Sequence, residues 1–515
     1  MRSKTLFAVA LALVASPAGA APHAGGEQTG ESPVLVATSS SPLATAFNNG
    51  RRMVRDSRDN RYLVYQDVSD GLPIVCFVRS SDGKVWSTPV TPAFGCFPSL
   101  AIDEHDHLFL VWQDLWQDPS STGIYCSRST DGGDTWESPC RLNPIPSSND
   151  DEPVVQYPVV EAGARYVYFA WQQGATAPAG TWHVIFFAAL PKDLLRPWGS
   201  YLWRISQLTV DARFPALACN LGFLDDGSVH VVWAESTATG AERICYRHMD
   251  ERTHLWTPPL DSLALDLSSG TSASTHRHPA ISVGNGEIAH VVWDHGSGGG
   301  FHSLLFADIA QARFDHEVPT WGDAMVCVDD VYLKYSALVW VSQDEVYYMQ
   351  ARDGALLHPD PVPVSERDGV PSRYPSVCYK QFRADSLDVV WTDGSEPPYR
   401  ILYRRMAKIY PGQSADQPAT SGPRRFALLS SHPNPFRAGT VVRYELPAPC
   451  GVRLEVLNVL GQRVRTLVDR PETTGAYQVG WDGRDEQGSN LPGGVYLCRL
   501  VAGSWATTTK LVLLR

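Results

Sequence analysis

Three arginines stand in the same local setting and provide the first candidate binding chemistry. Arg213, Arg277 and Arg373 each lie two residues before a proline, in RFP, RHP and RYP. A guanidinium is planar and presents a fork of N–H donors, so it can hold a carboxylate through two parallel hydrogen bonds. If the chain brings these segments together, the arginines and the adjacent His278 form a candidate site for an anionic ligand.

Carboxylates follow a second kind of segment. Apolar stretches such as LFLVWQD, VHVVWAES, AHVVWDHG and LDVVWTDG end in an aromatic residue that is followed by an acid. These acids complete the set of candidate ligand-binding residues and are Asp114, Glu235, Asp294 and Asp393. In the alternative, each arginine pairs with the acid that ends a neighbouring strand, as Arg277 with Asp294, and only ties the scaffold together. The spacing identifies no catalytic nucleophile.

The segments that carry these residues belong to an internal repeat. An apolar strand ending in an aromatic residue occurs seven times, roughly 45 to 60 residues apart. Five copies follow a segment with an aromatic residue or His before Pro, and proline is tolerated at the entry of a strand. Two further strands follow each copy. The seven aromatic residues are Tyr65, Trp112, Trp171, Trp233, Trp293, Trp340 and Trp391.

Repeats of four antiparallel strands at this spacing are typical of β-propeller blades. The pattern predicts an all-β fold with seven blades between residues 51 and 410; six blades and an irregular segment are the alternative. In a propeller, the first strand of a blade starts on the face where the second one ends. The arginines and the acids are therefore expected to meet at the mouth of the central channel.

The composition agrees with an all-β chain and excludes one class of partner. The 515 residues include 16 Trp, 41 Gly and 38 Pro, which favours short strands joined by turns. The formal net charge is −12, whereas proteins that bind a phosphate backbone usually carry a basic face. We therefore expect no nucleic-acid partner.

The N-terminus has the pattern of a secretory signal peptide over residues 1–20. A basic start is followed by an apolar run and a small-residue cleavage site, AGA. No later segment is apolar for long enough to span a bilayer, so the mature protein is expected to be exported and to lack a transmembrane segment. Residues 21–50 are an expected linker, in which Ser32 to Thr38 form a possible strand that closes the propeller ring.

Ten cysteines in an exported chain permit disulfides. Cys126 and Cys140 lie almost symmetrically about a Gly-Gly pair and are expected to face each other across a hairpin. Cys450 and Cys498 are a second possible pair. The chain has no CxxC motif, so no metal site and no cofactor are predicted.

One turn brings a family resemblance into view. The stretch STDGGDTW contains Ser129, Asp131, Gly133, Thr135 and Trp136 in the pattern SxDxGxTW. Glycine, serine and aspartate account for it as a tight turn between the third and fourth strands of a blade, so we interpret it as structural. It also resembles the Asp box (BNR repeat) of sialidases, and the resemblance covers residues 51 to 410.

That resemblance implies a sialidase-like propeller. Sialidases hold the substrate carboxylate with three arginines and use an Asp as acid and base with a Tyr-Glu pair as nucleophile. This chain lacks the FRIP sequence of the family, and RFP and RYP place the arginine before the aromatic residue instead. No Tyr-Glu pair stands out, so whether the chain is an enzyme is left open.

The tail differs from the repeats. Residues 411–425 are rich in Pro, Gly and Ser, as linkers are. Residues 426–515 alternate strand-like and turn segments, which predicts a small Ig-like β-sandwich. The segments HPNPF, LNVLGQRV, WDGRDEQG, LPGGVY and KLVLL resemble the C-terminal sorting domain of type IX secretion cargo and the Ig-like domain of flagellar hook-capping proteins. The resemblance implies export through the type IX machinery.

The resulting hypothesis is a secreted or cell-surface propeller that binds a glycan or another anionic ligand at its mouth. The first alternative is an exo-sialidase-type glycoside hydrolase. The second is a non-catalytic scaffold for protein contacts. The sequence does not decide whether the sorting domain is cleaved or anchors the protein.

Overall fold

A computed structural model describes the fold as two separate units, Met1–Asp416 and Gln417–Arg515. It describes residues 32–47, 50–114, 123–143, 155–163, 165–177, 180–193, 201–207, 210–220, 227–236, 240–268, 275–283, 288–295, 298–305, 313–318, 325–328, 335–352, 355–356, 361–378, 386–407, 427–432, 434, 436, 439–446, 450–472, 475–503 and 505–514. The predicted signal peptide and the linker 411–425 lie outside these residues.

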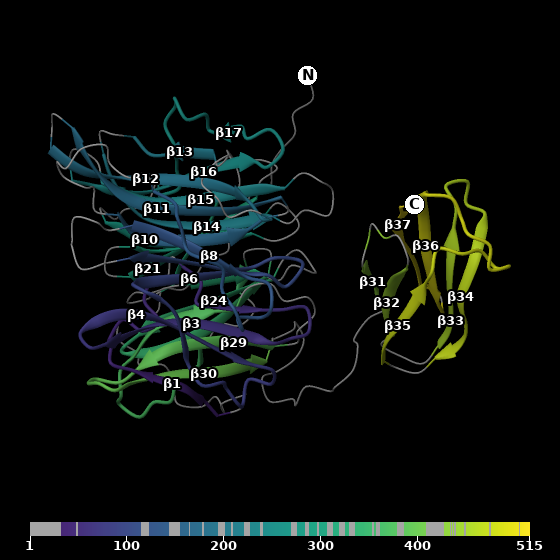
Figure 1. The fold of residues 1–515 in the computed structure, drawn as a ribbon, viewed down its shortest axis with the longest axis horizontal. Helices are drawn as coiled ribbons and strands as arrows, with labels where there is room; N and C mark the ends of the chain where they lie inside the picture. The colour runs from purple at the N-terminus through teal and green to yellow at the C-terminus, as the bar shows by residue number, and fades with distance from the viewer. Residues whose placement is uncertain are drawn as a thin grey trace, which may run out of the picture. The chain divides into compact units, whose positions relative to one another are not determined.

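The first unit consists of antiparallel sheets that follow one another along the chain (Figure 1). The first sheet is β2 (Met53–Arg55), β3 (Arg61–Ser69), β4 (Leu72–Ser80) and β5 (Val90–Phe94). The second is β6 (Cys96–Ile102), β7 (Leu108–Asp114), β8 (Gly123–Ser129) and β9 (Cys140–Arg141). The third is β10 (Val155–Ala162), β11 (Tyr166–Ala177), β12 (Gly180–Pro191) and β13 (Tyr201–Arg204). The fourth is β14 (Asp211–Asn220), β15 (Ser228–Ser236), β16 (Glu242–Asp250), β17 (Trp256–Thr257) and β18 (Leu265–Asp266).

Three more sheets complete this unit. The fifth is β19 (His276–Val283), β20 (Ile288–His295), β21 (Gly298–Leu305) and β22 (Arg313–Val318). The sixth is β23 (Met325–Val328), β24 (Tyr335–Ser342), β25 (Glu345–Arg352), β26 (Ala355–Leu356) and β27 (Val362–Pro363). The seventh is β28 (Ser372–Val377), β29 (Ser386–Asp393), β30 (Tyr399–Ala407) and β1 (Val34–Ser39). The all-β prediction is confirmed, and the described residues form seven blade-like sheets.

The aromatic residue that marks each repeat lies in the second strand of its sheet and is buried. Tyr65, for example, is 1% exposed, and Trp233 and Trp391 are fully buried. These side chains pack between neighbouring sheets: one core cluster joins Phe109 of β7 to Trp171 of β11. Because each sheet buries its face against the next one, the stack of blades is stabilised by apolar contacts between sheets.

The C-terminal unit is a β-sandwich, as expected from the tail sequence. One sheet is β31 (Ala427–His432), β32 (Thr440–Leu446) and β35 (Gly475–Trp481). The other is β34 (Arg463–Glu472), β33 (Cys450–Leu457), β36 (Gly494–Ala502) and β37 (Trp505–Leu513). Phe436, Trp481 and Tyr496 form the centre of its core, with ring centroids 5.4 and 5.3 Å apart along this series.

The tail motifs have structural roles in this sandwich. Asn434 of the HPNPF segment donates to the carbonyl of Lys510 at 2.8 Å and accepts from the amide of Val512 at 2.7 Å. Asn458 of the LNVLGQRV segment accepts from the amides of Leu460 and Gln462, both at 3.0 Å. These contacts fix the start of the domain against its last strand and close the β33–β34 turn.

The sequence suggested two cysteine pairs, and the structure places the members of one pair opposite each other and those of the other pair far apart. Cys126 and Cys140 are directly opposite each other in the β8–β9 ladder. The suggested pairing of Cys450 with Cys498 is wrong, because Cys498 is opposite Val456, six positions along β33 from Cys450. Six strand residues span about 20 Å, far beyond the reach of a disulfide.

Within the described residues, no helix has the length and apolar character needed to cross a membrane.

The N-terminal strand joins the last sheet to the first. β1 pairs with β30, from Val34 opposite Tyr403 to Ser39 opposite Tyr399, and the two strands lie side by side in Figure 1. The chain then passes into β2 of the first sheet. The seventh sheet therefore contains both the first and the last described strands of the propeller.

A buried carboxylate also connects these two sheets. Asp388 of β29 is fully buried and accepts from Arg61 Nε at 3.0 Å and from Tyr403 at 2.6 Å, and Arg55 Nη1 lies 3.2 Å away. Burial lowers the pKa of Arg55, but the charges of Asp388, Cys378 and Asp59 together outweigh burial and raise it. The first and the seventh blade thus share one buried ion cluster.

We expect Asp388→Ala to destabilise the propeller more than any exposed acid does. The substitution leaves the guanidiniums of Arg55 and Arg61 buried without this counter-charge, which costs about 3–5 kcal/mol. Urea unfolding followed by tryptophan fluorescence measures the loss. Asp134→Ala is the matched control, because its ion pair with Arg79 is exposed and is expected to contribute less than about 0.5 kcal/mol. Equal effects of the two substitutions would contradict this role of Asp388.

Candidate ligand site at the propeller mouth

The five first strands that contain proline share an unusual backbone. In β6, β10, β14, β19 and β28, the residue before the proline has a positive φ between 46° and 54°. The ladder to the second strand shifts register at the same place in each sheet. Positive φ is rare for bulky residues and costs of order 1–3 kcal/mol, so five repetitions indicate a selected geometry. A bulge of this kind re-aims the side chain that it carries.

The re-aimed side chains meet. They form what we call the aromatic floor: Phe47, Phe97, Tyr157, Phe214, His278 and Tyr374. Phe47 lies 5.4 Å from Phe97 and 4.9 Å from Tyr157, measured between ring centroids. The series continues from Tyr157 to Phe214 at 5.2 Å and on to His278 at 4.5 Å. All six rings are partly exposed, so the floor is available for stacking against a ligand.

Phe47 lies in the segment between β1 and β2. Residues of the last blade and of the first blade hold this segment in place. Thr45 donates from its amide to Thr392 Oγ1 at 3.1 Å and from its hydroxyl to the carbonyl of Tyr374 at 2.8 Å. The buried Arg52 donates to the carbonyls of Ala46 and Phe47. Burial lowers the pKa of Arg52 to about 9. The last and the first blade together position this ring.

Glutamines of the preceding blade support two of the bulges. Gln66 accepts from the amide of Phe97, and Gln172 accepts from the amide of Phe214, both at 3.1 Å. Each glutamine directly follows the buried aromatic residue of a second strand. Because the bulge removes the amide from the ladder, a side chain from the preceding sheet supplies the missing acceptor.

The three predicted arginines lie in bulged strands that carry the floor, β14, β19 and β28. Their side chains are 47%, 56% and 53% exposed in the order Arg213, Arg277 and Arg373. Each one precedes a residue of the floor in the sequence, so the structure places all three at this end of the sheets. Every one also has an acidic neighbour. Arg213 Nε lies 2.7 Å from Asp211, and Arg373 Nη2 lies 3.3 Å from Asp344.

The expected pair of Arg277 with Asp294 is wrong. Arg277 Nε instead donates to both carboxylate oxygens of Glu242 at 2.8 Å, and this hydrogen bond raises the pKa of Arg277. Asp294 is opposite Arg277 in the ladder, but its Oδ2 lies 2.7 Å from Nδ1 of His278. The left-handed backbone at His278 turns the ring toward Asp294, which explains the exchange of partners.

The other three candidate acids differ in burial. Glu235 is buried and accepts from Arg243 Nη2 at 2.6 Å. Asp393 is also buried and accepts from Ser372 at 2.8 Å and from Arg400 Nε at 2.9 Å. Asp114 is partly exposed at the end of β7. Glu235 and Asp393 are therefore each paired with an arginine of their own sheet. Asp294 instead contacts the floor through His278.

This arrangement suits binding better than nucleophilic chemistry. Burial raises the pKa of Tyr157, so its phenol is held in the protonated form rather than activated. The partly exposed arginines supply hydrogen-bond donors, and the rings supply flat apolar surface. An acidic sugar presents the complementary features, a carboxylate and faces of C–H groups.

The Asp-box residues lie at the opposite end of the sheets. Ser129 accepts from the amide of Gly133 at 2.8 Å, and Asp131 accepts from the amide of Thr135 at 2.9 Å. Hydrogen bonds from Thr135 lower the pKa of Asp131 to about 2. Gly133 has φ +88°, and a Cβ there would lie 2.3 Å from Phe77 of the first blade. Trp136 packs edge-on against the same ring at 5.5 Å. The turn therefore packs the second blade against the first.

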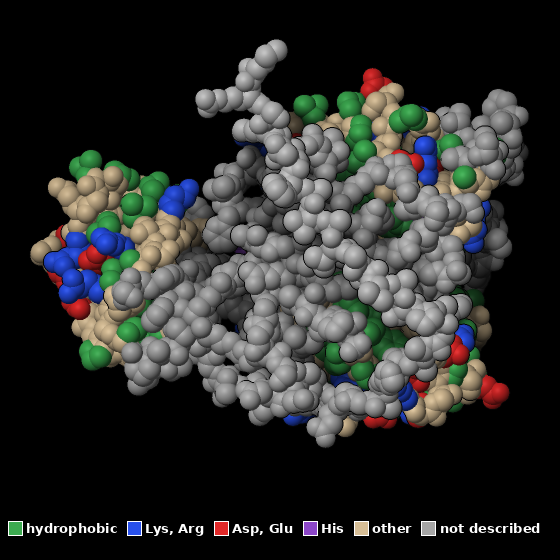
Figure 2. All heavy atoms as spheres, turned by 180° about the vertical axis from the view of Figure 1, so that it is seen from behind, with side chains coloured by type: hydrophobic (Ala, Val, Ile, Leu, Met, Phe, Trp, Pro, Cys, Tyr) green, Lys and Arg blue, Asp and Glu red, His purple; other side chains and the backbone are tan. Residues whose placement is uncertain are grey.

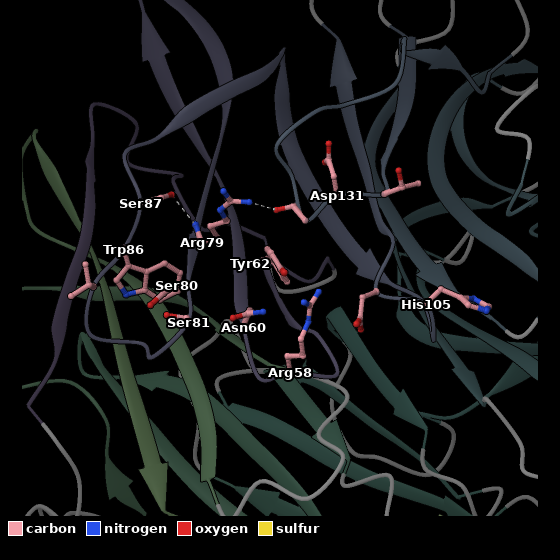
Figure 3. Close-up of a pocket in the computed structure, with 14 residues that line it drawn as sticks. Arg58, Asn60, Tyr62, Arg79, Ser80, Ser81, Trp86, Ser87, His105 and Asp131 are labelled. Atoms are coloured by element: carbon pink, nitrogen blue, oxygen red, sulfur yellow. Dashed lines mark hydrogen bonds between the residues drawn. The ribbon is translucent and has the colours of Figure 1, made fainter. Parts of the chain in front are cut away.

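A cavity of about 590 Å³ lies between the first and second blades beside this turn (Figure 3). Polar side chains dominate its lining, and Arg58, Asn60, Tyr62, Arg79, Trp86, His105 and Asp131 contribute to it. Arg79 closes one side by donating to the carbonyl of Gly132 at 3.1 Å. This cavity is separate from the aromatic floor.

Sequence reasoning found the arginines but missed the floor. The aromatic residue before proline was visible in four repeats, yet it was interpreted only as part of a strand entry. The signal for Gln66 and Gln172 was the glutamine that follows the aromatic residue in YQD and WQQ. Phe47 has no counterpart in the repeat, so no pattern pointed to it.

Comparisons with known proteins give a family match for the C-terminal unit and structural matches that cover the propeller. The FlgD Ig-like domain family matches residues 436–504. The chain therefore combines a β-propeller with a C-terminal domain of the FlgD Ig-like type. No curated protein sequence matches the chain.

Solved structures with a similar arrangement share little sequence. An α-L-arabinanase of Penicillium chrysogenum is 13% identical, with a TM-score of 0.43, over 73% of this chain and 98% of that one. The Hadza microbial sialidase Hz136 is 11% identical, with a TM-score of 0.41, over 67% and 73%. PorZ, a surface component of the type IX secretion system of Porphyromonas gingivalis, is 12% identical, with a TM-score of 0.38, over 91% and 60%.

Proposed function

We propose that the protein acts outside the cell as a carbohydrate-binding propeller, with the aromatic floor and its three arginines as the site for an acidic glycan. The observation that carries the proposal is the meeting of six partly exposed rings, three of which directly follow Arg213, Arg277 and Arg373 in the chain. Stacking on the rings accounts for affinity toward sugar faces, and the guanidiniums account for selectivity toward a carboxylate.

The ion pairs of these arginines do not oppose this function. Each of the three guanidiniums is about half exposed, so a ligand carboxylate can reach it and compete with the acid that it pairs with. The buried pairs of Glu235 and Asp393 serve the scaffold instead. Burial raises the pKa of Tyr157, so this phenol of the floor is not activated as a nucleophile.

Binding of the full mature chain to immobilised glycans that carry sialic or uronic acids tests the proposal. We expect Arg213→Ala, Arg277→Ala and Arg373→Ala each to weaken binding roughly tenfold or more, because each removes a hydrogen bond to a charged group. The combined variant should lose retention. Arg79→Ala is the matched control, since this arginine is similarly exposed and similarly paired but lies at the cavity on the other end of the sheets.

Two results would contradict this site. Unchanged retention of the combined variant would show that the three arginines do not bind the ligand. Loss of retention in Arg79→Ala alone would show that the ligand binds at the cavity between the first two blades instead.

A glycoside hydrolase of sialidase type is the second candidate, and one observation favours it. Asp294 Oδ1 is buried and has no hydrogen-bond partner among the residues that the structure describes, while Oδ2 is held by His278. A carboxyl that His278 orients beside a binding floor can serve as an acid or a base.

A fluorogenic sialoside distinguishes catalysis from binding. If the protein is a hydrolase, Asp294→Asn should reduce turnover by about a hundredfold or more, the usual contribution of a general acid or base. Asp344→Asn is the control, because this exposed acid only pairs with Arg373. Absence of turnover in the unchanged protein, or equal turnover in both variants, would leave binding as the function.

We also propose that residues 426–515 direct export through a type IX secretion machine. The proposal is supported by the tail motifs and by the match of residues 436–504 to the FlgD Ig-like family. Figure 2 shows basic and acidic side chains interspersed on this unit. Val459 and Leu460 at its β33–β34 turn are 69% and 79% exposed, an unusual position for apolar residues at a hairpin tip.

Removal of residues 417–515 tests this role in a host that has the machinery. We expect the shortened chain to stay in the periplasm and the full chain to reach the medium or the cell surface, as followed by fractionation. Val459→Ser with Leu460→Ser shows whether the exposed tip is needed. Export of the shortened chain would show that the C-terminal domain is not needed for export.

A further inference from the structure

The first two blades contain the same tight turn between their first and second strands. Asp56 begins one and Asp103 begins the other. The amide of each aspartate donates to the carbonyl four residues later, Asn60 at 3.0 Å and His107 at 3.1 Å. Asp59 and Asp106 occupy the left-handed region at the same position of the two turns. The backbone of this turn is thus a repeated scaffold feature.

The carboxylate of each aspartate closes its turn in the same way. Asp56 Oδ1 accepts from the amides of Arg58 and Asn60 at 2.9 and 2.8 Å. Asp103 Oδ1 accepts from the amides of His105 and His107, both at 2.9 Å. The turn therefore requires the aspartate and the backbone, while the side chains two and four residues later are free to differ.

The two turns differ at the second carboxylate oxygen. Asp56 Oδ2 accepts from Asn60 Nδ2 at 2.6 Å and from Tyr62 at 3.0 Å, so its hydrogen bonds are satisfied inside the first blade. Asp103 Oδ2 lies 3.2 Å from His107 Nδ1 and 4.0 Å from His105 Nδ1. Two imidazoles stand where the first blade has Arg58 and Asn60, and neither is needed to form the turn.

The three ligand atoms have the spacing of a metal site. Asp103, His105 and His107 each offer one oxygen or nitrogen atom, and these atoms all lie within 4.8 Å of one another. In a tetrahedral zinc site with bonds near 2.0–2.1 Å, neighbouring ligand atoms are about 3.4 Å apart. The 3.2 and 4.0 Å separations bracket this value. His105 is 67% exposed and can rotate to shorten the longer one.

The carboxylate is oriented before any ion arrives. The Asp103 side chain is almost fully buried, and the two backbone amides fix its Oδ1. Outer contacts of this kind hold a metal ligand in place. Glu104 lies nearby, with Oε1 3.6 Å from His105 Nδ1, while its Oε2 forms an ion pair with Lys192. The site thus combines a fixed carboxylate with two imidazoles and a nearby acid.

We propose that Asp103, His105 and His107 bind a divalent transition-metal ion of the zinc class. Imidazole nitrogens favour zinc, copper and nickel, whereas calcium and magnesium prefer all-oxygen sites. Three protein ligands leave a tetrahedral ion with one open position. His105 also lines the cavity between the first two blades (Figure 3), so a bound ion lies at the edge of that cavity. This site is independent of the aromatic floor.

The first blade supplies the variant that tests the proposal. His105→Arg with His107→Asn installs the residues of the sibling turn, Arg58 and Asn60, which the same backbone already accommodates. Calorimetric titration of the full mature chain with zinc chloride should show one site per chain that disappears in this double variant. His183→Asn is the matched control, because His183 forms a His–Asp pair with Asp211 at 2.9 Å without a second imidazole. Calcium chloride should not compete.

The expected result is the loss of one zinc site in the double variant and an unchanged titration in His183→Asn. Zinc binding that is equal in the double variant, or absent from the unchanged chain, overturns the proposal. If the double variant fails to fold, as judged by circular dichroism, His105→Arg alone takes its place. That side chain is mostly exposed, and at least a tenfold weaker affinity is expected from the loss of one ligand.

Discussion

The buried carboxylate of Asp388 is the contact on which the closed ring depends most. It receives hydrogen bonds from Arg61 of the first blade and Tyr403 of the last one, with Arg55 at 3.2 Å. A charge without partners at this depth would be strongly unfavourable, so the two blades must stay together to keep it satisfied. Apolar packing joins these two blades as well, because one core cluster contains Leu63 and Tyr65 of the first blade together with Val390 of the last.

Closure of the ring also builds the candidate site. The chain leaves β1 in the seventh sheet and enters β2 in the first, and Phe47 lies on that crossing. Its segment is bonded to Thr392 on one side and to Arg52 on the other. The ring that contacts Phe97, Tyr157 and Tyr374 is therefore in place only when the first and last blades meet. The stability of the propeller and the geometry of its mouth have a common origin.

The sequence was sufficient for the elements that repeat. Buried aromatic residues such as Trp233 mark every second strand because each blade needs the same large side chain between sheets. The mouth was predicted only in part. Arg213, Arg277 and Arg373 lie in first strands, as the repeat predicts, but the repeat did not reveal that Glu242 of the preceding sheet is the partner of Arg277. Phe47 depends on a contact between Thr45 and Thr392, 347 positions apart in the chain.

Differences between copies of a repeat help to separate scaffold from function. The two Asp turns share their backbone, yet Asp56 Oδ2 accepts from Asn60 and Tyr62 of the first blade, whereas Asp103 Oδ2 lies beside the imidazoles of His107 and His105. In the bulges, by contrast, Gln66 and Gln172 play the same part, since each accepts from a displaced amide while the rings stay partly exposed. Where the copies of a repeated feature have the same partners, packing explains the feature. Where one copy departs and brings metal-ligating side chains together without need of them for the turn, a ligand is the simplest reason for the departure.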